Sequence, residues 1–69
     1  MDPMAAYEAF DGAYTYLERL DAAIALADWL NGGGFVPAIG LCCFMDFCDW
    51  CECELGVDIN VEYPSEYPY

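Results

Sequence analysis

Five cysteines are the residues whose type and spacing come nearest to a recognised chemistry, that of metal binding. They are Cys42, Cys43, Cys48, Cys51 and Cys53. Cys48-Asp49-Trp50-Cys51 forms a C-x-x-C knuckle with Cys53 close behind it, as in zinc and iron–sulfur sites. Structural zinc takes four ligands, commonly from two separated knuckles, and the adjacent pair Cys42-Cys43 is a poor second knuckle. We therefore expect core cysteines and no cofactor, with a metal site at Cys48, Cys51 and Cys53 as the alternative.

The residue types needed for most catalytic mechanisms are missing. The chain has no His and no Lys, and its hydroxyl side chains other than tyrosine are Ser65 and Thr15. Neither hydroxyl has a nearby base type to activate it, and a reactive thiol needs a cation or a helix N-terminus to lower its pKa. Glycine-rich phosphate loops are also absent, since Gly32-Gly33-Gly34 lacks both the spacing and the basic residue. The sequence predicts that the protein is not an enzyme.

The charge balance is the most unusual property of the composition. Thirteen acidic residues stand against one cation, Arg19, in a chain of 69 residues that is 59% hydrophobic. An acidic chain with few apolar residues would be disordered, whereas this apolar content is enough for a core. Most carboxylates must then face water or a partner's cations, and their field would steer a basic partner toward the protein.

The N-terminal half has the pattern of two helices. Asp2 before Pro3 predicts an N-cap and a first helix through Phe10. A second helix is expected from Asp11 to about Leu30, where Asn31 and three glycines give a stop signal. Its predicted apolar face contains Ala13, Leu17, Leu20, Ile24 and Ala27. Its predicted acidic stripe contains Glu18, Asp21 and Asp28, together with Asp11.

The C-terminal half favours strands. Apolar residues occupy odd positions and polar residues even positions from Cys51 to Tyr63, a β alternation that a turn at Gly56 would divide. The run from Phe35 to Trp50 is nearly all apolar. Its aromatic residues favour strands, while the spacing of Asp46, Asp49 and Glu52 would suit a helix that starts after Pro37. We expect an α+β fold, in which the N-terminal helical region packs on a small antiparallel β-sheet from the C-terminal half.

The length predicts one compact acidic domain over residues 1–69, with an extended Tyr/Pro tail at 64–69. The start of the chain lacks the features of a signal peptide, so we expect a cytoplasmic protein. The uncharged run from Trp29 to Met45 is interrupted by glycines and Pro37 and has no flanking cations, so no membrane role is expected.

The predicted strand would carry a ladder of acids. Its members are Glu52, Glu54, Asp58 and Glu62, spaced like alternate side chains about 6.6 to 6.8 Å apart. With one cation, the chain should not bind nucleic acid directly. Phosphates of a DNA strand have through-space separations of the same order as this ladder. The ladder, extended by Glu18, Asp21 and Asp28, is therefore our predicted surface for docking in a groove built for DNA.

In size, charge and sparse cations the whole chain resembles a class of very small, acidic, phage-encoded DNA-mimic inhibitors, among them anti-CRISPR proteins. The resemblance involves no motif, so no residue role is carried over. It implies a non-enzymatic inhibitor, encoded by a phage or mobile element and acting in the bacterial cytoplasm. The implied partner is a basic DNA-binding protein or ribonucleoprotein, with a type I (multi-subunit) surveillance complex the leading case. The alternatives are the cysteine metal protein above and an acidic adaptor for another basic protein. We expect a monomer or weak dimer.

Overall fold

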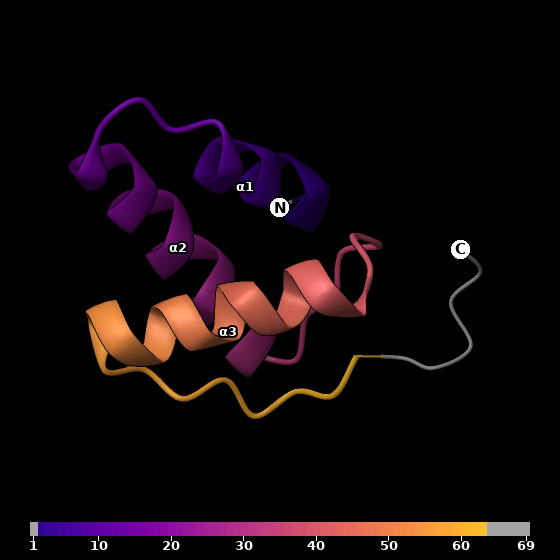
Figure 1. Ribbon diagram of the computed structural model, residues 1–69. Helices are drawn as coiled ribbons and strands as arrows, with labels where there is room; N and C mark the ends of the chain where they lie inside the picture. The colour runs from indigo at the N-terminus through magenta and orange to yellow at the C-terminus, as the bar shows by residue number, and fades with distance from the viewer. Residues whose placement is uncertain (1, 64–69) are drawn as a thin grey trace.

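The computed structural model describes residues 2–63 and contains three helices (Figure 1). They are α1 (Pro3–Asp11), α2 (Tyr16–Asn31) and α3 (Leu41–Leu55). An extended segment, residues 57–63, follows α3 and runs back along it (Figure 1). Within the described residues there is no strand. The predicted α+β fold with an antiparallel sheet is therefore wrong, and this part of the chain is all-helical.

The first helix confirms the local signals at its start. The Asp2 carboxylate accepts a hydrogen bond from the Met4 backbone N–H at 3.0 Å, and Pro3 occupies the first turn, where its missing N–H costs nothing. The helix ends at Asp11 with Gly12 as its C-cap, and the Gly12 N–H donates to the Glu8 carbonyl at 2.9 Å. The N-terminal element is therefore specified largely by its own sequence.

The second helix starts later than predicted. Its N-cap is Thr15, whose hydroxyl accepts a hydrogen bond from the Glu18 backbone N–H at 3.1 Å. Thr15-Tyr16-Leu17-Glu18 is the sequence of a capping box, a stronger start signal than the carboxylate of Asp11, which ends α1. The predicted stop is confirmed, since α2 ends at Asn31 with Gly32 as its C-cap.

The third helix overturns the strands predicted for residues 35–50. Residues 44, 47, 48, 51 and 55 follow one helical stripe of period 3.6, and all are buried or half-buried. This stripe lets Phe44, Phe47 and Cys51 reach one core. The helix continues to Leu55, five residues past Trp50. The helix that starts after Pro37, which the spacing of the acids allowed, is the correct interpretation.

The alternation from Cys51 to Tyr63 spans two different structures. Residues 51–55 form the last turns of α3, so Cys53 is exposed although the strand pattern predicts it on the inward side. Gly56 turns the chain at φ 65°, a left-handed conformation that favours glycine. Beyond it, odd residues are half-buried and even residues exposed, as predicted, but no other part of residues 2–63 forms a strand with which residues 57–63 could pair.

Side chains take the place of a partner strand for this segment. Asn31, at the end of α2, donates from its amide nitrogen to the Asp58 carbonyl and accepts from the Asn60 N–H, both at 3.1 Å. The Tyr63 hydroxyl accepts a hydrogen bond from the Gly40 N–H at 2.9 Å. Val57, Ile59, Val61 and Tyr63 pack against the core, so the segment closes one side of the helices.

The core lies where the three helices meet. Its buried members are Phe10, Ala23, Leu26, Ala27, Leu30, Val36, Phe44, Phe47 and Cys51. The Phe10 ring makes edge contacts with Phe47 at 5.0 Å and Trp50 at 5.1 Å between centroids, which joins α1 to α3. The predicted apolar face of α2 is largely wrong, because only Ala27 of its five members is buried. Ala23, Leu26 and Leu30, about a quarter turn away, are buried in its place.

Two further expectations concern the ends of the chain and the membrane. The predicted Tyr/Pro tail, residues 64–69, lies outside the described residues. Among residues 2–63, no helix has the length and apolar character needed to cross a membrane.

Candidate functional site: the acidic helix faces and the Arg19 pocket

The described part of the protein exposes all its acidic side chains. Every Asp and Glu among residues 2–63 is exposed, and no polar or charged residue there is buried. The carboxylates are therefore hydrated and available to a partner. Because they carry one sign of charge, their fields add instead of cancelling.

The one cation does not neutralise this surface. The Arg19 guanidinium lies over the Phe10 ring, 5.4 Å from its centroid, and forms no ion pair with any acid of residues 2–63. A cation over an aromatic face is stabilised by the negative charge of the ring face. Arg19 thus serves the contact between α1 and α2, and the acids remain without an internal counterion in the described region.

The predicted acidic ladder is not one surface. Glu52 and Glu54 belong to α3, whereas Asp58 and Glu62 lie on the extended segment beyond the Gly56 turn. Two residues along a helix turn the side chain by about 200°, so Glu52 and Glu54 leave α3 on different sides. Glu54 faces the start of α2 and accepts a hydrogen bond from the Tyr16 hydroxyl at 2.8 Å, which raises the pKa of Tyr16. The regular strand spacing is lost.

A different line of acids replaces it on α3. Asp46, Asp49 and Glu52 are all exposed and follow each other at intervals of three residues. Residues three apart on a helix have Cβ atoms about 5 to 6 Å apart on one side. We call these three residues the α3 acidic face. Asp46 and Asp49 are missing from the residues predicted to bind a partner, although their spacing was visible in the sequence.

The predicted stripe on α2 is partly preserved. Asp21 and Asp28 are exposed and two turns apart, so they project from nearly the same side of the helix. Glu18 is exposed in the first turn of α2, where a negative charge also interacts favourably with the helix dipole. The structure thus leaves all three side chains accessible, with Glu18 having a second role in the helix start.

The cysteines do not assemble a metal site. Cys51 is buried and Cys48 half-buried on the inner side of α3, while Cys53 is exposed on the outer side. Residues 2–63 contain no group of three His, Cys, Asp or Glu side chains placed to hold a metal ion. Burial raises the pKa of Cys51 to about 11 and also raises the pKa of Cys48. These two thiols therefore stay protonated near neutral pH and act as core residues. The expectation of core cysteines is wrong for Cys42, Cys43 and Cys53, which are exposed.

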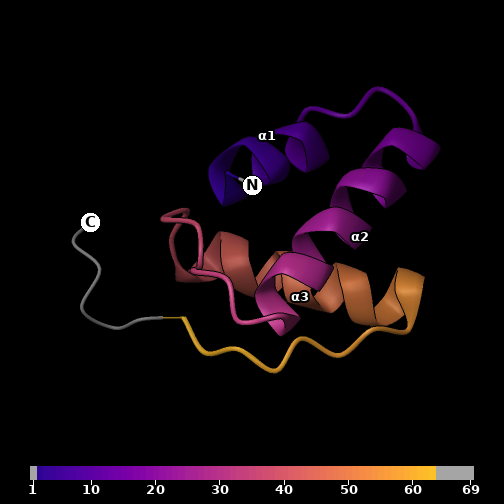
Figure 2. The same ribbon diagram turned by 180° about the vertical axis from the view of Figure 1, so that it is seen from behind.

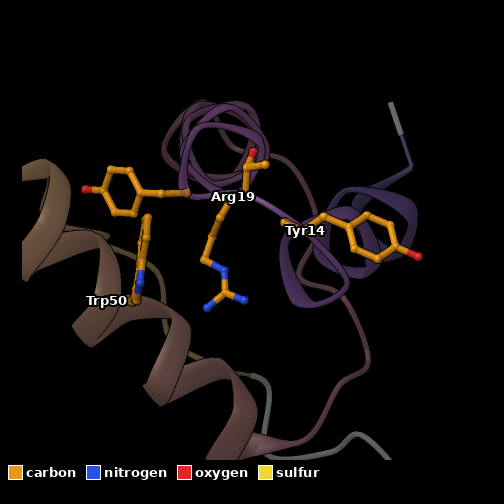
Figure 3. A pocket seen from close by; sticks show the side chains of 6 residues that line it. Tyr14, Arg19 and Trp50 are labelled. Carbon is orange, nitrogen blue, oxygen red and sulfur yellow. The ribbon is translucent and has the colours of Figure 1, made fainter.

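A small cavity opens between the start of α2 and α3. It has a volume of about 250 Å³ and is lined by Ala13, Tyr14, Thr15, Tyr16, Arg19 and Trp50. Figure 3 shows the Arg19 guanidinium extending between Trp50 and Tyr14. The lining has hydroxyls and a guanidinium but no carboxylate, thiol or imidazole that would act as a general base.

Comparisons with known proteins add no relative. No protein-family model matches the chain, and no curated protein or solved structure is significantly similar to it.

Proposed function

We propose that this protein is a non-enzymatic inhibitor that mimics DNA and occupies the basic nucleic-acid-binding groove of a target complex. In this proposal the protein acts in the bacterial cytoplasm as an anti-CRISPR protein of phage or mobile-element origin. The leading target is a type I, multi-subunit surveillance complex. Its partner is thus a basic protein or ribonucleoprotein, and it contacts neither free nucleic acid nor membrane.

One observation carries the proposal. All acids of residues 2–63 are exposed while the sole cation is held against the Phe10 ring. Net charge keeps a protein soluble, but a large charge of one sign also destabilises the folded state by self-repulsion. A net charge of −12 on 69 residues is a cost that docking on a basic surface would offset.

Dimensions and spacing support DNA mimicry in particular. The described part of the protein measures 33 × 22 × 21 Å between Cα atoms, and its long dimension is close to one turn of duplex DNA, about 34 to 36 Å. The Cβ atoms of neighbouring acids on the α3 acidic face are about 5 to 6 Å apart, whereas DNA carries one phosphate per about 3.4 Å of axial rise on each strand. The through-space distance between consecutive phosphates is larger than this rise, so the two spacings are of the same order.

The mechanism follows from electrostatics. The negative field accelerates association with a basic groove, and the carboxylates then pair with the lysines and arginines that would bind phosphates. Target DNA is excluded because the same cations cannot hold both ligands. Inhibition should be stoichiometric and should weaken as salt screens the charges.

A competition experiment tests the proposal. A purified type I surveillance complex is mixed with labelled target DNA and increasing amounts of the protein, and DNA binding is followed by mobility shift at several salt concentrations. We expect DNA binding to be lost near one protein per groove, with less inhibition at higher salt. Full DNA binding at a large excess of the protein would reject this target class. Association with the complex without loss of DNA binding would favour the acidic adaptor instead.

Charge-neutralised variants show which acids matter. Asp46→Asn, Asp49→Asn and Glu52→Gln together remove the α3 acidic face while keeping side-chain shape. The matched set is Glu54→Gln, Asp58→Asn and Glu62→Gln, which removes the same number of charges from the dispersed acids. We expect the first set to weaken inhibition more, because its charges are clustered. Equal small losses would mean that net charge alone produces the effect.

A further inference from the structure

A line of aliphatic side chains on α2 is left uncovered by the rest of the described protein. Leu17 is 71% exposed and Ile24 is 43% exposed, and half-buried Leu20 lies between them. α2 packs through a different side, that of Ala23, Leu26 and Leu30. Figure 2 shows α1 beside α2, with α3 crossing its C-terminal half. Leu17 and Ile24 thus stay accessible to a partner.

The spacing of these residues is that of a helix–helix interface. Leu17 and Ile24 are seven residues apart and Leu20 is three after Leu17, which corresponds to the a, d, a positions of a heptad. Asp21 and Asp28 then occupy two successive e positions, and both are exposed. We call Leu17, Leu20 and Ile24, with Asp21 and Asp28 along their edge, the α2 seam.

Charge selects the occupant of this seam. A second copy of the chain would bring another net charge of −12 and would place its own aspartates beside these. A partner helix with Lys or Arg at its flanking positions would instead pair with Asp21 and Asp28 while burying Leu17 and Ile24. The surface is complementary to a helix that is apolar along one line and basic beside it.

We propose that the α2 seam binds a basic amphipathic helix of the target. This inference rests on the proposed function and deepens it, because it names the element of the basic partner that is engaged. The aliphatic side chains give the contact a lifetime that charge alone does not, since truncating buried anchors acts mainly on dissociation whereas rim charges act mainly on association. The seam is short, so binding should be weak for an isolated helix and should depend on low salt.

Two synthetic peptides of one composition serve as probes. The first is a helical peptide with leucine at a and d positions and lysine at e and g positions. The second has the same leucines and lysines in scrambled order, so that it keeps the charge but loses the apolar line. Each is titrated into the isotopically labelled full chain at low salt, and backbone amide shifts are followed by NMR. We expect the amphipathic peptide to bind more tightly and to shift residues 17–28.

Variants separate the apolar contact from the charge. Leu17→Ser with Ile24→Ser should weaken the amphipathic peptide about tenfold and leave the scrambled peptide unchanged. Asp21→Asn with Asp28→Asn should weaken both peptides and reduce the salt dependence. Met45→Ser is the control, because Met45 is 55% exposed and belongs to α3, outside the seam. Circular dichroism checks that each variant keeps its helices, and Leu17→Ser alone replaces the double variant if that one unfolds.

The outcomes distinguish this inference from the function on which it rests. Equal affinity for the two peptides, or amide shifts confined to the α3 acidic face, would overturn the role of the seam and leave DNA mimicry intact. No salt-dependent binding of either peptide, combined with no competition against DNA, would reject the proposed function as well. Self-association of the unmodified protein through residues 17–28 would show that a second copy is the occupant, which also overturns the inference.

Discussion

The backbone N–H of Asn60 donates a hydrogen bond of 3.1 Å to the side-chain oxygen of Asn31, at the end of α2. The same side chain donates to the Asp58 carbonyl, so one amide group bonds the extended segment as a neighbouring strand would. A sheet is unnecessary here, since Asn31 and the apolar contacts of the odd residues hold residues 57–63 on the helices.

Replacing Asn31 tests this attachment. Asn31→Ala removes both side-chain hydrogen bonds and should lower the free energy of unfolding by about 1 to 2 kcal/mol, as expected for two partly solvated bonds. Asn60→Ala is the matched control, because it keeps the backbone N–H that makes the contact. Urea denaturation measures the stability, and exchange of the Asn60 amide should be faster in Asn31→Ala. Equal stability of the two variants would contradict the role of Asn31.

Thr15 should contribute to stability as the cap of α2. Thr15→Ala leaves the Glu18 N–H without its side-chain acceptor and should destabilise the protein by about 1 kcal/mol, whereas Thr15→Ser retains the hydroxyl and should change little. Urea denaturation compares the three proteins. An unchanged midpoint for Thr15→Ala would show that the Thr15 cap contributes no measurable stability.

Gly34 is required by the ring of Trp29. A Cβ added at Gly34 would collide with the Trp29 indole, whose Nε1–H donates to the Phe35 carbonyl at 2.9 Å. Gly34→Ala should therefore displace the ring and destabilise the fold by about 1 to 3 kcal/mol. Ala38→Ser, at an exposed position of the same loop, is the control. A Trp29 indole resonance that stays in place in the NMR spectrum of Gly34→Ala would refute the collision.

Alkaline pH should destabilise the protein through Cys51. Burial raises the pKa of Cys51 from 9.0 to about 11, so the unfolded chain loses this proton at a lower pH than the folded protein does. The contribution of the protonated Cys51 thiol to the free energy of unfolding is fully present below about pH 9 and is lost as the pH rises toward 11. Cys51→Ala should have a flatter stability profile between these values, measured by urea denaturation under reducing conditions. Cys53→Ala, at an exposed site, should retain the slope.

Repulsion among carboxylates predicts that added salt stabilises the protein. Sodium chloride should raise the melting temperature by screening the net charge of −12. Asp49→Asn should also stabilise the protein, raising the free energy of unfolding by about 0.5 kcal/mol, because Asp49 lies between the like charges of Asp46 and Glu52 on α3. Glu18→Gln is the contrasting variant. It should destabilise the protein, because a negative charge in the first turn of α2 interacts favourably with the helix dipole. Equal gains from both variants would argue against position-dependent repulsion.

Local signals determined the ends of the first two helices but not the form of the C-terminal half. Asp2 with Pro3, and Asn31 with its glycines, act within one turn of chain, so they could be identified without a structure. Thr15 and Glu18 form an equally local signal, a capping box, at the start of α2. For residues 35–50 the apolar run fits a buried strand or a buried helix. Only the tertiary structure, in which Phe44, Phe47 and Cys51 enter one core from one side of a helix, distinguishes the two.

Composition determined that the surface would be acidic, and tertiary structure decided how the acids are arranged. Thirteen acids with one cation cannot be paired internally, whatever the fold. Their grouping depended on whether residues 51–55 turn by 100° or by 180° per residue, which separated Glu52 from Glu54 and brought Asp46 and Asp49 into line with Glu52. Ala23, Leu26 and Leu30 are buried, whereas Leu17 and Ile24 are exposed. All five are apolar, so the packing of the neighbouring elements and not residue type determines which side of α2 is buried. A sequence pattern gives the period of an apolar face, but only the neighbouring elements determine which face they cover.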